Sequence, residues 1–183
     1  QNWITAGLDV IMICTAGNYK DTEKLYTDAR AKGITIIQFN MPIELWDPAL
    51  VLDTCSVGYD NILQSGYVAG KFIAEKLGGK GKVAIITGQL GASNLNERID
   101  GVKEALAAYP DIEIVAVEGT EDDLAKAVSV TEAILRGNPD LAGIFGMSQV
   151  GGPAVAKVLA QQEFADRKGA VAVFAFDDLP DTI

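Results

Sequence analysis

The stretch KVAIITGQLGASNLNERIDGVKEALAAY, residues 82–109, sets the pattern for the whole chain. Residues 82–87 form a mainly apolar run of strand length, and residues 9–14 form a nearly continuous one, which is typical of a strand covered on both faces in a parallel sheet. Residues 88–94 supply glycine and polar side chains for a loop. Beyond the loop, apolar side chains recur at helical spacing, namely Ile99, Val102, Ala105 and Leu106. The stretch therefore predicts a strand at 82–87, a loop at 88–94 and a helix at 96–109, which together make one βα unit.

The same alternation continues in both directions along the chain. We expect further strands at residues 9–14, 34–39, 112–117, 141–146 and 171–176, an extended segment at 49–57, and helices at 21–32, 60–77, 121–136 and 153–161. This order predicts an α/β fold built from doubly wound parallel sheets. Because the segment at 49–57 is not followed by a tight βα turn, we expect two lobes, residues 1–59 and 60–183.

Composition excludes several classes of function. The 183 residues carry 15 basic and 25 acidic side chains, so the net charge of −10 would repel nucleic acid and anionic membrane surfaces. The sequence has no histidine, which excludes Ser-His and Cys-His nucleophile pairs and histidine-based zinc sites. Its two cysteines, Cys14 and Cys55, are too few for a four-ligand cluster, and their apolar surroundings favour buried free thiols.

The sequence lacks the common phosphate-binding motifs. Gly146 and Gly151 have the spacing of the first two glycines of a phosphate loop. The next two residues are Gly152 and Pro153, where a lysine and a serine or threonine are required. No G-x-G-x-x-G follows a predicted strand, so the dinucleotide-binding fingerprint is also missing. We therefore expect no enzymatic activity, no cofactor and no metal.

Polar residues follow the predicted strands where each strand ends. Ligands of parallel sheets bind beyond these carboxyl ends, so the residues there are candidate contacts. They are Thr15, Asn18, Asn40, Asn94, Asn96, Arg98, Asp122, Ser148, Gln149 and Asp177. Amide, guanidinium and carboxylate groups together suit a neutral polyhydroxylated ligand, because a hydroxyl donates to a carboxylate and accepts from the other two.

Each candidate also has a purely structural interpretation. Asp177 lies in Asp-Asp-Leu-Pro-Asp, which suits a helix N-cap equally well. Arg98 lies between acidic neighbours, where a solvated ion pair on the helix is the commoner role. Residues 121–123 form an acidic helix start, where the helix dipole favours anions. Asn40 is also a residue type that favours turns. For Trp46 we favour a structural role, in which its ring fills the interior of its own loop, over stacking on a sugar.

Four motifs occur together along the chain. They are Asp60-Asn61 with Gly66 and Gly70, LGGKGKVA at 77–84, NERIDGVKEAL at 96–106, and a strand ending Ala175-Phe176-Asp177. In this combination the chain resembles the type I periplasmic sugar-binding proteins over essentially its whole length. The resemblance implies two lobes joined by a multi-strand hinge, with a sugar or polyol between them. The same fold serves as the effector domain of LacI-type repressors, so the fold alone leaves both functions open.

The resemblance also implies a set of ligand contacts. They are Asn40, Met41, Arg98, Asp122, Ser148 and Asp177. Only Arg98 and Asp177 keep the residue type that is usual in the family. Met41 stands where an arginine usually clamps the sugar, and Asp122 stands where an aromatic ring often stacks on it. The ligand is therefore open among pentoses, hexoses, deoxy sugars and cyclic polyols.

By the same resemblance, the chain is the solute-binding component of an ABC importer that closes over its ligand and delivers it to a membrane permease. We expect a monomer in the periplasm or another extracytoplasmic compartment, with no nucleic-acid contact by this segment. Against the family pattern the chain is expected to be truncated at both ends, so that the signal peptide and the start of the first lobe lie outside it. The alternative is a LacI-type effector domain. Such domains dimerise through the faces of their lobes, and the sequence shows no extended apolar patch for this beyond the pattern of the core, which speaks against the alternative.

Overall fold

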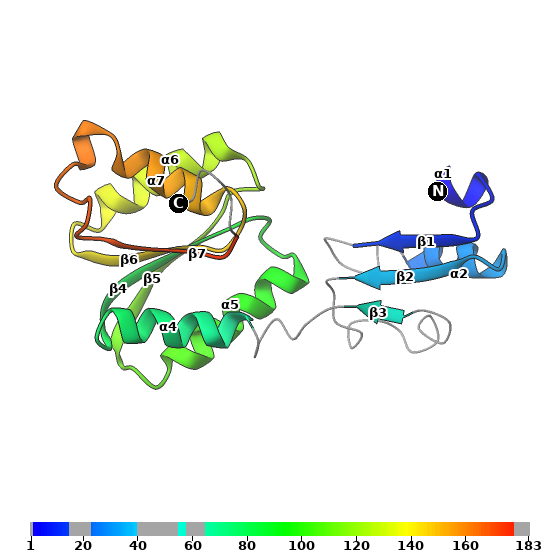
Figure 1. Cartoon of the computed structure of the whole chain (residues 1–183), viewed down its shortest axis with the longest axis horizontal. Coiled ribbons are helices and arrows are strands. Elements are labelled where there is room, and N and C mark those ends of the chain that lie inside the picture. Colours follow the sequence, from blue (N-terminus) through cyan, green and yellow to red (C-terminus); the bar gives the residue numbers. More distant parts are fainter. Residues whose placement is uncertain (1, 15–22, 40–54, 58–64, 178–183) are drawn as a thin grey trace.

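The computed structural model describes residues 2–14, 23–39, 55–57 and 65–177, which form two parallel sheets (Figure 1). The first sheet has the strand order β1-β2-β3, and the second has the order β5-β4-β6-β7. Every strand pair in both sheets is parallel. The predicted α/β class with parallel sheets is confirmed. The expected lobe boundary near residues 58–60 and the side chain of Trp46 lie outside the described residues.

The first sheet is a small βα arrangement with one covered face. Its elements are α1 (Asn2–Thr5), β1 (Val10–Ile13), α2 (Glu23–Ala31), β2 (Thr35–Phe39) and β3 (Cys55–Val57). Its buried cluster consists of Ile4, Ile11, Tyr26, Ala29, Ile34 and Ile36. Strand β2 pairs in parallel with both β1 and β3, and α2 lies between β1 and β2 in the chain, as the sequence alternation predicts.

The other face of β1 corrects an expectation. Val10 and Met12 are 48% and 64% exposed, whereas Ile11 between them is buried. Successive side chains of a strand point to opposite faces, so the described residues cover only the face that carries Ile11. Cys14 follows on the open face and is an exposed free thiol. The prediction of a buried Cys14 was therefore wrong, and the side chain of Cys55 lies outside the described residues.

The second sheet is a three-layer sandwich. Its strands are β4 (Lys80–Thr87), β5 (Asp111–Gly119), β6 (Leu141–Gly146) and β7 (Ala172–Ala175). Its helices are α4 (Val68–Lys76), α5 (Ser93–Leu106), α6 (Leu124–Gly137) and α7 (Gly151–Leu159), with the short 3-10 helix η4 (Gln162–Phe164). Helices α4 and α5 cover one face of the sheet, and α6 and α7 cover the other (Figure 1).

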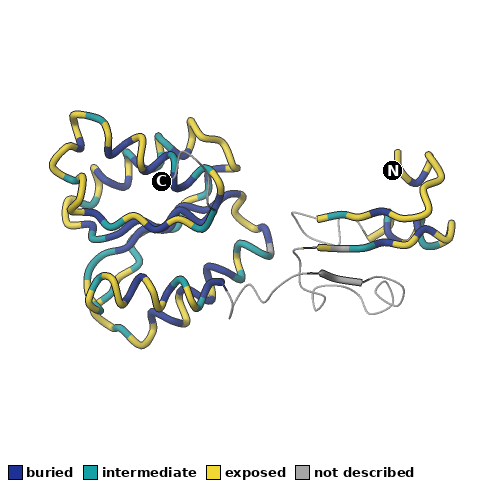
Figure 2. The backbone as a smooth tube through the Cα atoms, in the orientation of Figure 1, coloured by how far each residue is buried: buried dark blue, intermediate teal, exposed yellow. Residues whose placement is uncertain are grey.

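Strand β4 divides the core into two halves. Val83 and Ile85 pack into the cluster on the α4–α5 side, whereas Ala84 and Ile86 pack into the cluster on the α6–α7 side. All four side chains are completely buried. In Figure 2, dark blue buried segments run through the middle of this sheet, between the two layers of helices. The mainly apolar run at 82–87 therefore arises because both faces of this strand are covered.

The two helices on the α4–α5 side pack at unusually short range. A methyl group added to Gly70 would lie 2.7 Å from the Ala105 Cβ and 2.8 Å from the Val102 carbonyl oxygen. Gly66 lies equally tightly against the main chain of Arg98. These glycines let the start of α4 press on α5 and fix the main chain at Arg98.

Several predicted boundaries are shifted by a few residues. Strand β4 already begins at Lys80, two residues before the predicted strand at 82–87, and is preceded by Gly78 and Gly79, both with positive φ. Helix α5 begins three residues before the predicted start, at Ser93. Helix α6 begins at Leu124, with Asp123 as the N-cap that accepts a hydrogen bond from the Lys126 N–H at 2.7 Å. The interpretation of residues 121–123 as a helical first turn was therefore wrong.

Candidate ligand-binding site

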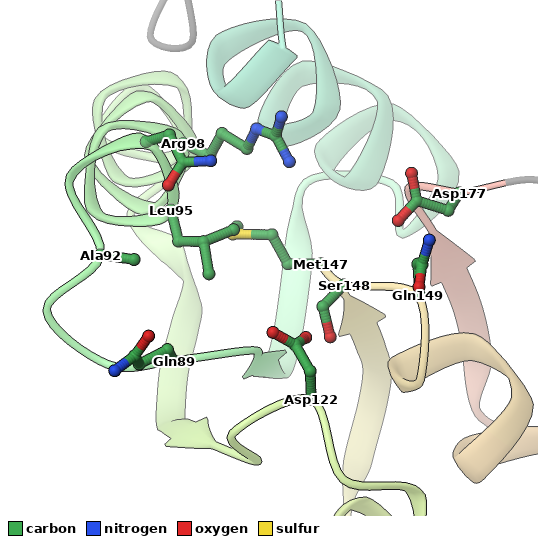
Figure 3. Close-up of a pocket in the computed structure, with 10 residues that line it drawn as sticks. Gln89, Ala92, Leu95, Arg98, Asp122, Met147, Ser148, Gln149 and Asp177 are labelled. Atoms are coloured by element: carbon green, nitrogen blue, oxygen red, sulfur yellow. The ribbon is translucent and has the colours of Figure 1, made fainter. Parts of the chain in front are cut away.

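A pocket of about 210 Å³ opens at the carboxyl edge of the second sheet (Figure 3). Each of the four strands contributes to it through the segment that follows the strand. The polar lining consists of Gln89, Asn94, Arg98, Asp122, Ser148, Gln149 and Asp177, and the apolar lining of Ala92, Leu95 and Met147. This is the place where a parallel sheet is expected to hold a ligand.

Four of the six residues singled out by the sequence come together in this pocket. They are Arg98, Asp122, Ser148 and Asp177. The other two, Asn40 and Met41, lie outside the described residues. Asn96 is exposed and does not line the pocket. Sequence reasoning missed Gln89, although its position directly after the strand at 82–87 was a usable signal.

Arg98 is held inside the protein rather than on its surface. Its side chain is only 7% exposed, although it belongs to the first half of α5. The guanidinium carbon lies 4.2 Å from the centroid of the Phe176 ring. A cation over an aromatic face is attracted by the negative charge density of the ring. The solvated surface position considered for Arg98 is therefore wrong, and the pocket contains a largely desolvated guanidinium group.

Ser148 presents a hydroxyl group that has no hydrogen-bond partner among the described residues. The segment after β6 turns sharply, because Gly146 lies directly against Gly151 and Gly152 at the start of α7. The Met147 N–H donates to the Ile86 carbonyl oxygen at 2.8 Å, which fixes the turn to the end of β4. The Ser148 Oγ is buried and makes no hydrogen bond within the described part of the chain. A buried hydroxyl without a partner is costly, so this atom is suited to bond an incoming ligand.

Asp122 projects from the loop between β5 and α6. The Thr120 and Glu121 N–H groups both donate to the Gly88 carbonyl oxygen, at 2.9 and 3.0 Å. Asp122 itself adopts a left-handed conformation with φ of 56°, which directs its side chain away from the course of the helix. In Figure 3 the Asp122 carboxylate and the Ser148 hydroxyl point toward one another.

Asp177 is placed by an extension of the sheet beyond β7. The Phe176 N–H donates to the Gly146 carbonyl oxygen at 3.0 Å, so the residue before Asp177 is tied to the end of β6. Asp177 is partly exposed and lies beside Gln149 in Figure 3. Residues 178–183, which would form the helix that Asp177 could cap, lie outside the described residues.

The chemistry of the pocket is that of hydrogen bonding. Two carboxylates, one guanidinium group, several amides and one hydroxyl surround a small apolar floor. Within the described ranges, no group of three or more acidic or cysteine side chains is arranged to hold a metal ion. None of the helices in the described ranges has the length and apolar character needed to cross a bilayer. The arrangement suits a ligand that carries several hydroxyl groups.

Comparison with known proteins assigns the family. Residues 1–183 match the profile of the periplasmic binding protein domain. The chain belongs to this family. Members matched by the chain are named as binding proteins, not enzymes, in agreement with the expectation from the sequence.

Two curated relatives in this family are similar to part of the chain. The ribose import binding protein of Salmonella typhimurium is 30% identical over 125 residues, which cover 68% of this chain and 40% of the relative. The D-allose-binding periplasmic protein of Escherichia coli is 32% identical over 117 residues, or 63% of this chain and 37% of the relative. The chain therefore spans about 40% of the length of the curated relatives it matches.

Two solved structures of periplasmic binding proteins are similar over almost the whole chain. An ABC transporter solute-binding protein from Burkholderia graminis, in complex with D-arabinose, superposes with a TM-score of 0.90 and is 46% identical. The match covers 99% of this chain and 60% of that one. A periplasmic solute-binding protein from Actinobacillus succinogenes with bound D-allose gives a TM-score of 0.82 at 31% identity, covering 98% of this chain and 62% of that one. The type I periplasmic binding protein fold expected from the sequence is confirmed.

Proposed function

We propose that the chain is part of the solute-binding component of an ABC importer and captures a sugar or polyol. The family assignment and the transport-related names of its relatives support an importer over a LacI-type effector domain. The observation that carries the proposal is the pocket. There the desolvated guanidinium group of Arg98 shares one lining with two carboxylates and with the Ser148 hydroxyl, which has no hydrogen-bond partner in the described part of the chain.

In this proposal, each side chain of the pocket contacts a different kind of group on the ligand. Arg98 donates charge-assisted hydrogen bonds to ring or hydroxyl oxygens of the ligand, and Asp177 and Asp122 accept from its hydroxyl groups. The Ser148 hydroxyl can both donate and accept, so it can form a hydrogen bond with one further hydroxyl group of the ligand. The same bond gives the Ser148 Oγ a partner. Leu95 and Met147 offer apolar contact to the carbon skeleton. No cofactor or metal has a role in this scheme.

The proposed mechanism is closure of two lobes, residues 1–59 and 60–183, over the ligand. Asn40 and Met41 of the first lobe would complete the contacts made from the second. A ligand that touches both lobes favours the closed form only by its higher affinity for that form. The closed protein, a monomer in an extracytoplasmic compartment, then delivers the ligand to a membrane permease.

A ligand panel tests this proposal. The complete protein is titrated calorimetrically with D-ribose, D-arabinose, D-allose and xylitol, and its unfolding temperature is measured with each. At least one of the four should bind and raise the unfolding temperature, because a ligand that binds only the folded state stabilises it. The absence of binding by all four would refute a sugar or polyol site of this class.

Asp177→Ala tests the site itself. Loss of a charge-assisted hydrogen bond should weaken binding by about 10- to 100-fold and lower the ligand-induced rise in unfolding temperature at the same ligand concentration. Asp140→Ala is the matched control, because Asp140 pairs with Lys82 at the opposite end of β4, away from the pocket. Undiminished stabilisation in the Asp177 variant would remove Asp177 from the site.

A further inference from the structure

We propose that Gly88 is a positioning residue of this pocket, because the missing side chain at Gly88 leaves the space that the Asp122 carboxylate occupies. The proposal rests on the proposed function and identifies what sets the selectivity of that same site. Gly88 does not line the pocket, so no direct contact with a ligand is implied.

The loop that carries Asp122 is fastened to the end of β4 by main-chain acceptors. The Thr120 N–H donates to the Thr87 and Gly88 carbonyl oxygens at 3.0 and 2.9 Å, and the Thr120 Oγ1 donates to the Thr87 carbonyl at 2.9 Å. Glu121 adds a bond from its N–H to the Gly88 carbonyl. Thr120 is completely buried, so these bonds are shielded from water. The main chain next to Asp122 is therefore fixed against Gly88.

The carboxylate of Asp122 then lies directly over the Gly88 Cα. A Cβ atom added to Gly88 would lie 2.5 Å from the Asp122 Oδ1, 2.8 Å from its Oδ2 and 2.9 Å from its Cγ. These are the three nearest atoms to that position, and all belong to one side chain. Even the smallest side chain at position 88 is incompatible with the observed place of the carboxylate.

The backbone at position 88 does not itself require glycine. Gly88 is not among the described glycines with positive φ, so an alanine could adopt its conformation without strain. The obstacle is the end of a flexible, exposed side chain, which can turn away at little cost. Gly88→Ala should therefore leave the fold intact. The distance between the new Cβ at position 88 and the Asp122 Oδ1 should rise from 2.5 Å to 3.4 Å or more, which is ordinary van der Waals contact.

A double-mutant cycle tests this coupling in the complete protein. Binding of D-ribose, D-arabinose, D-allose and xylitol is measured by calorimetry for the wild type, Gly88→Ala, Asp122→Ala and the variant with both substitutions. Gly88→Ala should weaken the best ligand by about tenfold, and the double variant should bind no more weakly than Asp122→Ala alone. Additive losses would overturn the proposal, because they would mean that Gly88 acts independently of Asp122.

Gly119→Ala is the matched control. Gly119 ends β5 next to the same loop, but a methyl group there meets mainly the exposed side chain of Leu90, at 2.6 Å from its Cγ, and approaches Gly88 only at its carbonyl oxygen, at 3.3 Å. Leu90 does not line the pocket, so this variant should bind the four compounds as the wild type does. A loss equal to that of Gly88→Ala would point to general distortion of the loop and would overturn the proposal.

A crystal structure of Gly88→Ala gives a result that requires no ligand. The proposal predicts an unchanged main chain at residues 119–123 and a rotated Asp122 side chain. A carboxylate that keeps its place while the main chain moves would overturn it. If the wild type binds none of the four compounds, the proposed ligand class fails, whereas the position of the Asp122 carboxylate still decides the role of Gly88.

Discussion

The guanidinium carbon of Arg98 lies 4.2 Å from the centroid of the Phe176 ring, and Phe176 directly precedes Asp177 in the chain. One short segment after β7 therefore supplies both the aromatic support of the buried cation and one of the carboxylates of the pocket. The Phe176 N–H is itself bound to the Gly146 carbonyl oxygen. Arg98 and Asp177 are thus placed relative to one another through a single, hydrogen-bonded residue.

Phe176→Leu should weaken ligand binding without unfolding the protein. Leucine keeps much of the apolar contact but removes the ring face beneath Arg98, an interaction worth about 0.5–2 kcal/mol, so a loss of about 2- to 30-fold in affinity is expected. Calorimetry with the best ligand of the panel measures it. Phe164→Leu is the control, since Phe164 lies under Arg136, at 5.5 Å, and lines no part of the pocket. Equal losses in both variants would contradict the prediction.

Ser148→Ala should separate binding from stability. The Oγ that it removes has no partner in the described part of the ligand-free chain, so the free energy of unfolding should stay equal or rise slightly. Ligand affinity should fall by about 2- to 12-fold, the value of one ordinary hydrogen bond.

Thr87→Val is the companion variant for Ser148→Ala. It also removes a buried hydroxyl without a partner among the described residues, but outside the pocket lining. Its unfolding should respond in the same way, while its ligand affinity stays unchanged. Marked destabilisation by Ser148→Ala, seen in chemical denaturation without ligand, would show that its hydroxyl already has a structural partner.

The pair Arg136–Glu163 should make stability depend on pH. Arg136 donates to Glu163 from Nε at 2.7 Å and from Nη2 at 3.0 Å, joining α6 to η4. The hydrogen bonds from Arg136 hold the pKa of Glu163 below its ordinary value. The contribution of the pair is therefore present above the unfolded pKa of about 4.3 and is lost as the pH falls through the lower, folded value.

Glu163→Gln tests this dependence. Wild type should unfold at a higher temperature than the variant at pH 6, and the difference should shrink toward pH 3. Because both side chains are about half exposed, the difference at pH 6 should also shrink in 1 M NaCl. Arg136→Gln should give the same pH dependence as Glu163→Gln. A difference that is constant with pH would show that the ion pair is not its cause.

Cys14 should react as a surface thiol. It is exposed and makes no disulfide bond among the described residues, so a maleimide should modify it in the folded chain without denaturant. Mass spectrometry of the modified chain measures the extent. The variant Cys14→Ser isolates any reaction at Cys55. Modification of Cys14 only after addition of guanidinium would contradict the exposed position.

The sequence predicts most of the second sheet because its signals there are strong and local. The strand at 141–146 is found with both of its ends, since an apolar run is flanked by polar residues and glycine. Arg98 and Asp177 could be proposed for one site because carboxyl ends of parallel strands meet at one edge. This prediction could be made without knowing any side-chain contact.

Other features depend on contacts that no sequence pattern contains. The left-handed conformation of Glu121 and Asp122 follows from hydrogen bonds to Thr87 and Gly88, more than thirty positions earlier in the chain. The burial of Arg98 depends on Phe176 and Gly66, which lie on other elements. Cys14 was misplaced because an apolar run does not reveal whether a second layer covers it.

The carboxyl-edge position of the pocket has a consequence for how such a protein can change. The core of the second sheet ends with the strands, whereas Gln89, Asp122 and Gln149 are exposed on the segments beyond them. Exchanging these three side chains alters the hydrogen-bonding pattern offered to a ligand but opens no cavity among the packed residues. Selection for a new nutrient and selection for a folded scaffold therefore act on largely separate positions, which lets one architecture diversify without passing through unstable intermediates.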